Sequence, residues 1–245
     1  MLFRSLGVAY VQETTVFREF GPLAGNTIRI GYEFAPRIGD TLSRQTVDLD
    51  ARYYLRLAGT GLAAFRLRGF RSWGDFPDFL FFGGNSELRG YEYLEFVGHK
   101  AVFANAELRF PLIEAMLTPI GVLGGIRGVL FFNFGAAGLD GVPMKLWTSR
   151  TETVTPIEGI GFDPLFGAFV PVLGRPRTIS GFRLVDGRAS YGVGLETFAL
   201  GFPIHFDWSW RTLFNRDWED ALFAFRGGSG WFRRVRFDVW IGYDF

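Results

Sequence analysis

The sequence predicts an all-β protein, an antiparallel transmembrane β-barrel with about nine strands in this chain. Apolar and polar residues alternate over segments of about ten residues, which is the period of a strand with one apolar and one polar face. The polar faces carry acidic and basic side chains in close succession, as a water-filled lumen permits. Short turns alternate with long loops along the chain, which is the asymmetry of outer-membrane barrels.

The predicted strands run along the whole chain. We expect them at residues 4–17, 25–36, 44–58, 61–72, 99–112, 125–136, 188–200, 202–214 and 233–245. Segment 44–58 alternates from Val47 to Leu57, with Asp48 and Asp50 on the opposite face. Segment 99–112 carries Asn105, Glu107 and Arg109 on its polar face.

The last two segments show the alternation best. In 202–214 one face consists of Phe202, Ile204, Phe206, Trp208 and Trp210, and the other of His205, Asp207, Ser209 and Arg211. In 233–245 the apolar face consists of Val235, Phe237, Val239, Ile241, Tyr243 and Phe245. Aromatic residues at the strand ends are typical of the girdles of a lipid-facing band.

The connections differ in length. "AGTG" (58–61) and "LG" (200–201) predict tight turns, whereas 73–98, 137–187 and 215–232 are long loops. We also interpret "GPLAG" (21–25) and "GVLGG" (121–125) as turns. Short turns at one end and long loops at the other place loop 73–98 on the outside of the membrane. Loop 137–187 is rich in Gly, Pro and Thr, and either caps the barrel externally or contains an extra hairpin.

Composition excludes several classes of function. The 26 basic residues nearly balance 25 acidic ones, so the chain has no basic field that would attract nucleic acid. There is no cysteine, which excludes disulfides and thiolate metal sites. No apolar run reaches the roughly 18 residues of a membrane helix. Gln12 and Glu13 stand where a signal peptide would have its cleavage site, so we recognise no export signal.

Two alternatives remain at this point. A soluble β-sandwich also alternates, with its apolar faces turned inward, but the dense mixed charge and the aromatic strand ends favour the barrel. An odd strand count is awkward, because bacterial single-chain barrels have even numbers and open edges are costly in lipid. Either the chain is the C-terminal part of a longer protein that extends upstream of Met1 or pairs edge to edge with a second copy, or one N-terminal strand is miscounted.

Three motifs resemble one protein family. "GGNSELRGY" (83–91) is similar to the Arg-Gly-aromatic lid-loop motif of BamA- and TamA-type barrels, the bacterial surface antigen superfamily. "ANAELRFPL" (104–112) resembles the strand after that loop, and "GVLFFNFGAAG" (128–138) the next one. Five predicted strands follow the motif, as in the sixteen-strand barrel of the family. The resemblance covers roughly residues 1–245 and implies one outer-membrane barrel domain that is the C-terminal half of such a barrel.

The resemblance implies a role for the lid loop 73–98. In such barrels this loop folds back into the lumen, and its tip arginine reaches acidic groups on the inner wall. The lid-loop residues would be Gly83, Gly84, Arg89, Gly90 and Tyr91. A guanidinium gains from bidentate bonds to a carboxylate, and the glycines allow a tight tip. We expect loss of Arg89 to affect function more than stability, on the assumption that its ion pair is wet.

One position departs from the family pattern. The family usually carries Asp where this chain has Asn133. Either Arg89 is therefore anchored more weakly, or its partner on the inner wall is Glu107 or Glu196.

The last strand resembles an outer-membrane assembly signal. Trp240, Gly242, Tyr243 and Phe245 supply its alternating glycine and aromatic pattern. Such a strand can pair with the exposed edge of an assembly machine. A plain lipid-facing strand would use the same residues.

Enzymatic readings fit poorly. His99 and His205 are the only histidines, and His205, Asp207 and Ser209 lie in a row along one strand rather than converging on a substrate. We expect no catalytic residues, no cofactor and no metal.

The resemblance implies a bacterial outer-membrane protein, of Gram-negative type, that inserts or passes polypeptides. Its partners would be outer-membrane lipid, the barrel assembly machinery and unfolded polypeptides. Two other functions stay open, namely an anchor barrel for a soluble upstream domain and a passive pore or surface antigen.

Overall fold

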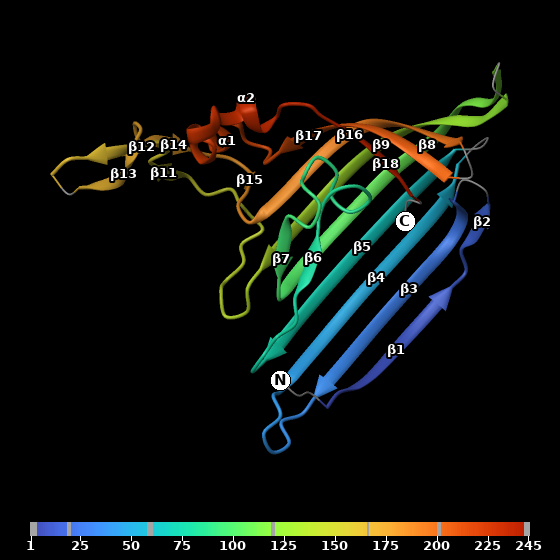
Figure 1. Cartoon of the computed structure of the whole chain (residues 1–245), viewed down its shortest axis with the longest axis horizontal. Coiled ribbons are helices and arrows are strands. Elements are labelled where there is room, and N and C mark those ends of the chain that lie inside the picture. The colour runs from blue at the N-terminus through green and yellow to red at the C-terminus, as the bar shows by residue number, and fades with distance from the viewer. Residues whose placement is uncertain are drawn as a thin grey trace.

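The computed structural model describes residues 4–18, 21–57, 61–118, 121–165, 167–199 and 202–242. Its main element is one antiparallel sheet with strand order β1-β3-β4-β5-β8-β9-β16-β17-β18, and β2 pairs with β3 outside that order (Figure 1). Its strands are β1 (Leu6–Glu13), β2 (Val16–Arg18), β3 (Gly21–Ala35), β4 (Arg44–Arg56), β5 (Leu62–Gly74), β8 (Lys100–Thr118), β9 (Gly121–Gly138), β16 (Gly187–Ala199), β17 (Phe202–Thr212) and β18 (Arg236–Ile241).

The sheet is open. Each strand pairs with its neighbours in this order, and no pairing between described residues joins β1 to β18. β1 and β18 are therefore edge strands, whose outer backbone groups are available to a further strand. The all-β antiparallel prediction is confirmed.

Two glycine-rich segments that we interpreted as turns lie in strands. Residues 21–24 pair with β2, and 121–124 pair with 115–118 in the hairpin that extends β8 and β9. Glycine weakens a strand but does not prevent ladder pairing when a partner strand lies alongside. Because the paired strands β8 and β9 continue through the segment that we interpreted as a turn, the strands that we predicted at 99–112 and 125–136 are shorter than the observed ones. The segment predicted as one strand at 4–17 is interrupted at Thr14 and Thr15 between β1 and β2.

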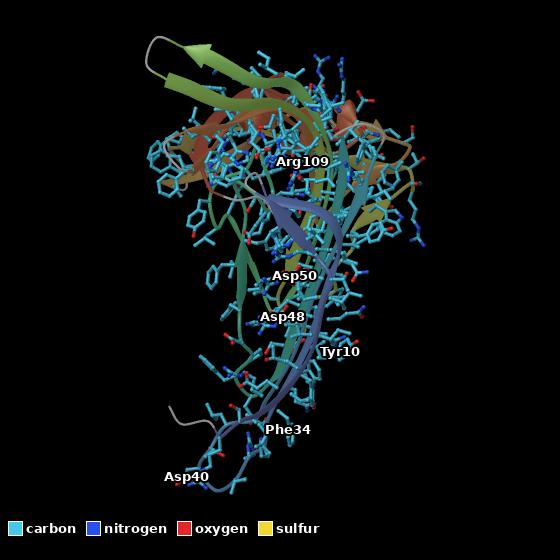
Figure 2. All side chains as sticks on the ribbon, turned by 90° about the vertical axis from the view of Figure 1, so that its right-hand side faces the viewer. Tyr10, Phe34, Asp40, Asp48, Asp50 and Arg109 are labelled. Carbon is cyan, nitrogen blue, oxygen red and sulfur yellow. The ribbon has the colours of Figure 1, made fainter. Side chains whose placement is uncertain are left out.

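The two faces of the sheet differ in chemistry. On the convex face, side chains such as Phe65, Leu108 and Val193 are exposed, although they are large and apolar. Asp48, Asp50 and Arg109 lie on the concave side, and Tyr10 lies on the other side (Figure 2). Asp50 accepts hydrogen bonds from Arg52 and Arg66, so the concave face is lined with paired charges. An apolar face this large needs an apolar phase or a partner layer to cover it.

The structure contains short helices only. None of those in the described residues is long and apolar enough to cross a membrane. α1 (Arg216–Leu222), η1 (Ala224–Arg226) and α2 (Gly228–Phe232) lie in the predicted loop 215–232. Asn215 caps α1 by accepting from the backbone N–H of Trp218. Phe232 packs with Leu184, Ala189 and Leu213, which attaches this helical segment to the end of the sheet.

Two other long loops contain strands of their own. β6 (Leu80–Phe82) pairs with β7 (Phe96–Gly98) in loop 73–98, on the concave side of the sheet (Figures 1 and 2). Loop 137–187 contains three successive strand pairs that form an arm projecting beyond the strand ends (Figure 1). They are β10 (Trp147–Thr148) with β15 (Arg183–Leu184), β11 (Glu152–Val154) with β14 (Arg177–Ile179), and β12 (Ile157–Asp163) with β13 (Ala168–Leu173). The three pairs are nested around one turn, so the arm is a single long β-hairpin interrupted twice, as one of the two sequence-based alternatives expected.

A carboxylate ties the loop after β3 to the end of β5. Asp75 Oδ2 accepts from the Ser43 backbone N–H at 2.9 Å and from its hydroxyl at 2.7 Å, and Arg37 forms an ion pair with the same carboxylate. These contacts lower the pKa of Asp75 to about 2. Because the pKa is depressed, the contribution is complete above the unfolded value of about 4 and is lost as the pH falls through 2.

We expect Asp75→Asn to free this loop at neutral pH, so that trypsin cleaves after Arg37 several-fold faster than in the wild type. Asp40→Asn, in an exposed residue of the same loop, is the matched control and should change nothing. With pepsin, wild type and Asp75→Asn should differ at pH 4 and converge at pH 2. Equal rates of tryptic cleavage for all three proteins would show that the Asp75 contacts do not hold this loop in place.

Candidate functional site

The tip of loop 73–98 is built by glycines in left-handed conformations. Gly83, Gly84 and Gly90 have φ of 137°, 73° and 86°. A Cβ on Gly83 would lie 2.6 Å from the Glu92 carbonyl oxygen, so a side chain there would collide with the returning chain. Gly84 and Leu88 exchange backbone hydrogen bonds, which closes the turn that presents Arg89. We call residues 83–95 the lid tip.

The lid tip is packed onto the concave face of the sheet. Phe82, Leu88 and Tyr91 form a buried cluster with Ala101 and Phe103 of β8. The Tyr91 hydroxyl donates to the Ala189 carbonyl of β16 at 3.1 Å, and burial raises the pKa of Tyr91. The Asn105 side chain donates to the Glu87 carbonyl at 2.5 Å. The lid tip is therefore held by both apolar packing and hydrogen bonds.

Arg89 lies at the centre of this interface. Its Nη2 is 2.9 Å from Glu107 Oε1 of β8, and its Nε is 3.2 Å from Asp207 Oδ2 of β17. The guanidinium carbon lies 4.5 Å from the centroid of the Phe131 ring, a cation–π contact. The side chain is only 3% exposed, and those of Glu107 and Asp207 are 1% and 4% exposed. Arg89 is thus a buried cation between two buried carboxylates.

The two carboxylates are themselves supported. Glu107 Oε2 accepts from Arg109 Nε at 2.9 Å. Asp207 Oδ2 accepts from the Trp240 indole N–H at 2.7 Å, and the Trp240 ring stacks on His205 with centroids 3.7 Å apart. Buried charges persist when they are paired and hydrogen-bonded in this way. The site therefore joins the lid tip to β8, β9, β17 and β18.

A family model for the Omp85 superfamily domain matches residues 10–245. The chain belongs to the Omp85 superfamily. This confirms the resemblance to the bacterial surface antigen family that the lid-loop motif indicated. No individual curated protein matches the chain.

Superfamily membership indicates a general class of function. Omp85 proteins take part in outer-membrane protein assembly and translocation, and they work with outer-membrane machinery and substrates. The domain implies a bacterial outer-membrane location. Members of the superfamily are generally non-enzymatic transport and assembly proteins.

Asn133 and Glu196, the other residues that we expected to contact Arg89 in this Omp85 domain, interact with other side chains of the inner wall. The Asn133 side chain accepts a hydrogen bond from Asn105 at 2.8 Å and donates one to the Ser190 hydroxyl at 3.2 Å, which forms a row of side-chain hydrogen bonds across β8, β9 and β16. Glu196 lies 3.8 Å from Arg127. Asp207, which we had considered only beside His205, supplies a second carboxylate to Arg89. A neutral residue at 133 is thus compatible with a charged anchor.

Two glycines of the Omp85 domain that sequence reasoning missed leave room for the site. Gly192 and Gly194 lie on the concave face of β16, next to the register positions of Phe131 and Asp207. A Cβ on Gly192 would collide with the Phe131 ring and the Trp208 carbonyl, and one on Gly194 with Asp207 Oδ1. The available signal was the pattern "YGVGLE" in a strand whose nearest other inward residues, Ser190 and Glu196, are polar.

The terminal strand of the Omp85 domain is described through Gly242. Trp240 points to the concave side, and Gly242 has a φ of 154°, in the region that favours glycine. Two residues of the predicted assembly signal, Tyr243 and Phe245, lie outside the described residues.

The histidines and the nearby serine do not converge on a common point. His205 Nε2 lies 2.9 Å from the Gly242 carbonyl, and the Ser209 hydroxyl donates to the Arg236 carbonyl. His99 Nδ1 accepts from the Asp140 backbone. Across the described ranges, no group of three or more His, Asp or Glu side chains could hold a metal ion.

Proposed function

We propose that residues 1–245 form the C-terminal half of a sixteen-strand, BamA/TamA-type barrel domain in a Gram-negative outer membrane, and that this domain inserts or passes polypeptides. The observation that carries the proposal is the burial of Arg89 between Glu107 and Asp207. A lid that covers the inner face of a sheet and is held by a compact ionic contact can regulate access to a lumen. Loop 73–98 is the lid, and loop 137–187 the long outer loop.

The faces and edges of the sheet support the same function. The convex face is apolar and exposed, which suits lipid, and the concave face is charged, which suits a wet lumen. β1 and β18 are edge strands, and an edge strand can receive an incoming polypeptide by β-augmentation. Within this proposal, Gly83, Gly84, Arg89, Gly90 and Tyr91 act as the lid-loop motif. Trp240, Gly242, Tyr243 and Phe245 act as the signal that the barrel assembly machinery recognises, while outer-membrane lipid and unfolded polypeptides are the other partners.

Proteoliposomes test this function. The full chain, once shown to fractionate with outer membranes, is reconstituted and mixed with a urea-denatured small outer-membrane barrel protein. The folding of this added protein is measured by gel electrophoresis without heating, in which the folded and unfolded forms migrate differently. We expect the folding rate to be at least about tenfold higher than in protein-free liposomes, which corresponds to a reduction of the activation barrier by about 1.4 kcal/mol.

Arg89→Ala should lose most of this acceleration, whereas Arg56→Ala, in an exposed inner-face residue at the end of β4, should keep it. Ion conductance without accelerated folding would instead identify a passive pore. If the proteoliposomes show neither accelerated folding nor ion conductance, the remaining function is that of a membrane anchor.

A further inference from the structure

The terminal strand β18 is weakly held by the sheet itself. Within the described part of the chain it has six residues and pairs on one side only, with Ile204–Ser209 of β17, and Gly242 adds one backbone hydrogen bond to Pro203. By comparison, β17 and β16 are paired over eleven positions. A short edge strand with a single neighbour is the part of a sheet that opens most readily.

The concave side chains of β18 contact the lid tip. Arg236 donates to both oxygens of Glu92, from Nη1 at 2.5 Å and from Nη2 at 3.1 Å, although the two residues are 144 positions apart. Trp240 donates to Asp207, the carboxylate that also faces Arg89, and the Trp240 ring lies 5.9 Å from the Arg89 guanidinium carbon. β18 is therefore connected to the lid tip at two places along its length.

Between these two places, the Gly90 backbone of the lid tip lies against side chains of β17. A Cβ on Gly90 would lie 2.9 Å from the Ser209 hydroxyl oxygen, and Gly90 has a φ of 86°, so glycine is favoured at this close approach. Ser209 in turn donates to the Arg236 carbonyl of β18. The lid tip, β17 and the first residue of β18 thus form one continuous contact.

We propose that the lid tip is a latch for the terminal strand, with Glu92 and Arg89 as the residues that position β18. When the lid tip is docked, Glu92 holds Arg236 and Arg89 holds the Asp207–Trp240 pair. When the lid tip withdraws, β18 loses both contacts and keeps only its ladder to β17. Its edge then becomes free to exchange partners with another extended strand. Lid movement and release of the terminal strand are in this view a single event.

Hydrogen exchange of the full chain in detergent micelles or nanodiscs tests the latch. Glu92→Gln removes the outer contact but leaves Arg89 in place, and Glu92 is largely exposed, so the variant should fold. We expect the amides of 236–241 to exchange up to about fivefold faster than in the wild type, the range for a solvent-exposed ion pair. The amides of β4 should be unchanged, and Glu92→Asp should restore most of the protection.

Asp48→Asn is the matched control, because Asp48 forms an ion pair with Arg68 on the same concave face, between β4 and β5, strands that do not pair with β18. It should leave exchange in 236–241 at the wild-type rate. Faster exchange in 83–95 with no change in 236–241, or no change in either segment of Glu92→Gln, would overturn the latch. The assay contains no polypeptide substrate, so its outcome is independent of the proposed translocation activity.

Discussion

Replacement of Arg89 by alanine should lower the free energy of unfolding of the detergent-solubilised chain by about 3–5 kcal/mol, the usual cost of breaking a buried ion pair. The variant would leave Glu107 and Asp207 buried without the cation between them. Glu107 retains Arg109, so Asp207 carries most of the penalty. This differs from the sequence-based expectation that function would suffer more than stability, because the ion pair is buried rather than wet.

Guanidinium unfolding followed by tryptophan fluorescence measures this cost. Arg89→Lys should lie between alanine and the wild type, since lysine keeps the charge but not the planar fork. Arg56→Ala removes an exposed arginine from the same concave face and should shift the free energy by less than about 0.5 kcal/mol. If Arg89→Ala and Arg56→Ala unfold at the same denaturant concentration, the ionic anchor contributes nothing to stability.

Replacement of Gly192 by alanine should displace the lid tip without removing any polar group. The added methyl group would collide with the Phe131 ring, on which the Arg89 guanidinium rests, and with the Trp208 carbonyl of β17. The carbonyl belongs to a paired strand and cannot move aside cheaply. We expect a loss of about 1–3 kcal/mol, as for other overpacked sites, together with exposure of Arg89.

Limited trypsin digestion reads out that exposure, since Arg89 is buried when the lid tip is docked. Cleavage after Arg89 should be at least tenfold faster in Gly192→Ala, which corresponds to about 1.4 kcal/mol in the undocking equilibrium. Gly230→Ala is the control, because a Cβ at Gly230 has no atom within 4 Å. A wild-type digestion pattern for Gly192→Ala would show that β16 accommodates the methyl group and that Gly192 is not required for docking.

Much of the sheet was predictable because each strand has one chemical character per face. In 204–211 the apolar and polar residues alternate without interruption, and the structure pairs 204–209 on both sides within a strand. Where glycine interrupts the alternation, prediction failed. "GVLGG" suggested a turn, yet it lies in β9, because pairing with β8 supplies what the local sequence lacks.

The site was only partly predictable. The lid-loop motif singled out Arg89 and placed Glu107 on the inner wall, but nothing in the local sequence joined Asp207 to them. Asp207 is 118 positions from Arg89, and their approach depends on the curvature and register of five strands together. The long loops were the least predictable part, since the arm at 137–187 and the helices at 215–232 have mixed composition without a clear period.

The amino-acid sequence was sufficient to predict which face of each strand is charged, which residue stands at the tip of the lid, and which superfamily the chain belongs to. These properties are local, because alternation and turn chemistry are set by neighbours along the chain. Only the tertiary structure decided that Arg89 lies between two carboxylates, that Gly192 and Gly194 leave room for it, and that Glu92 reaches Arg236. These contacts join residues far apart in the chain, and a one-residue change of register would turn every one of the inward side chains to the other face.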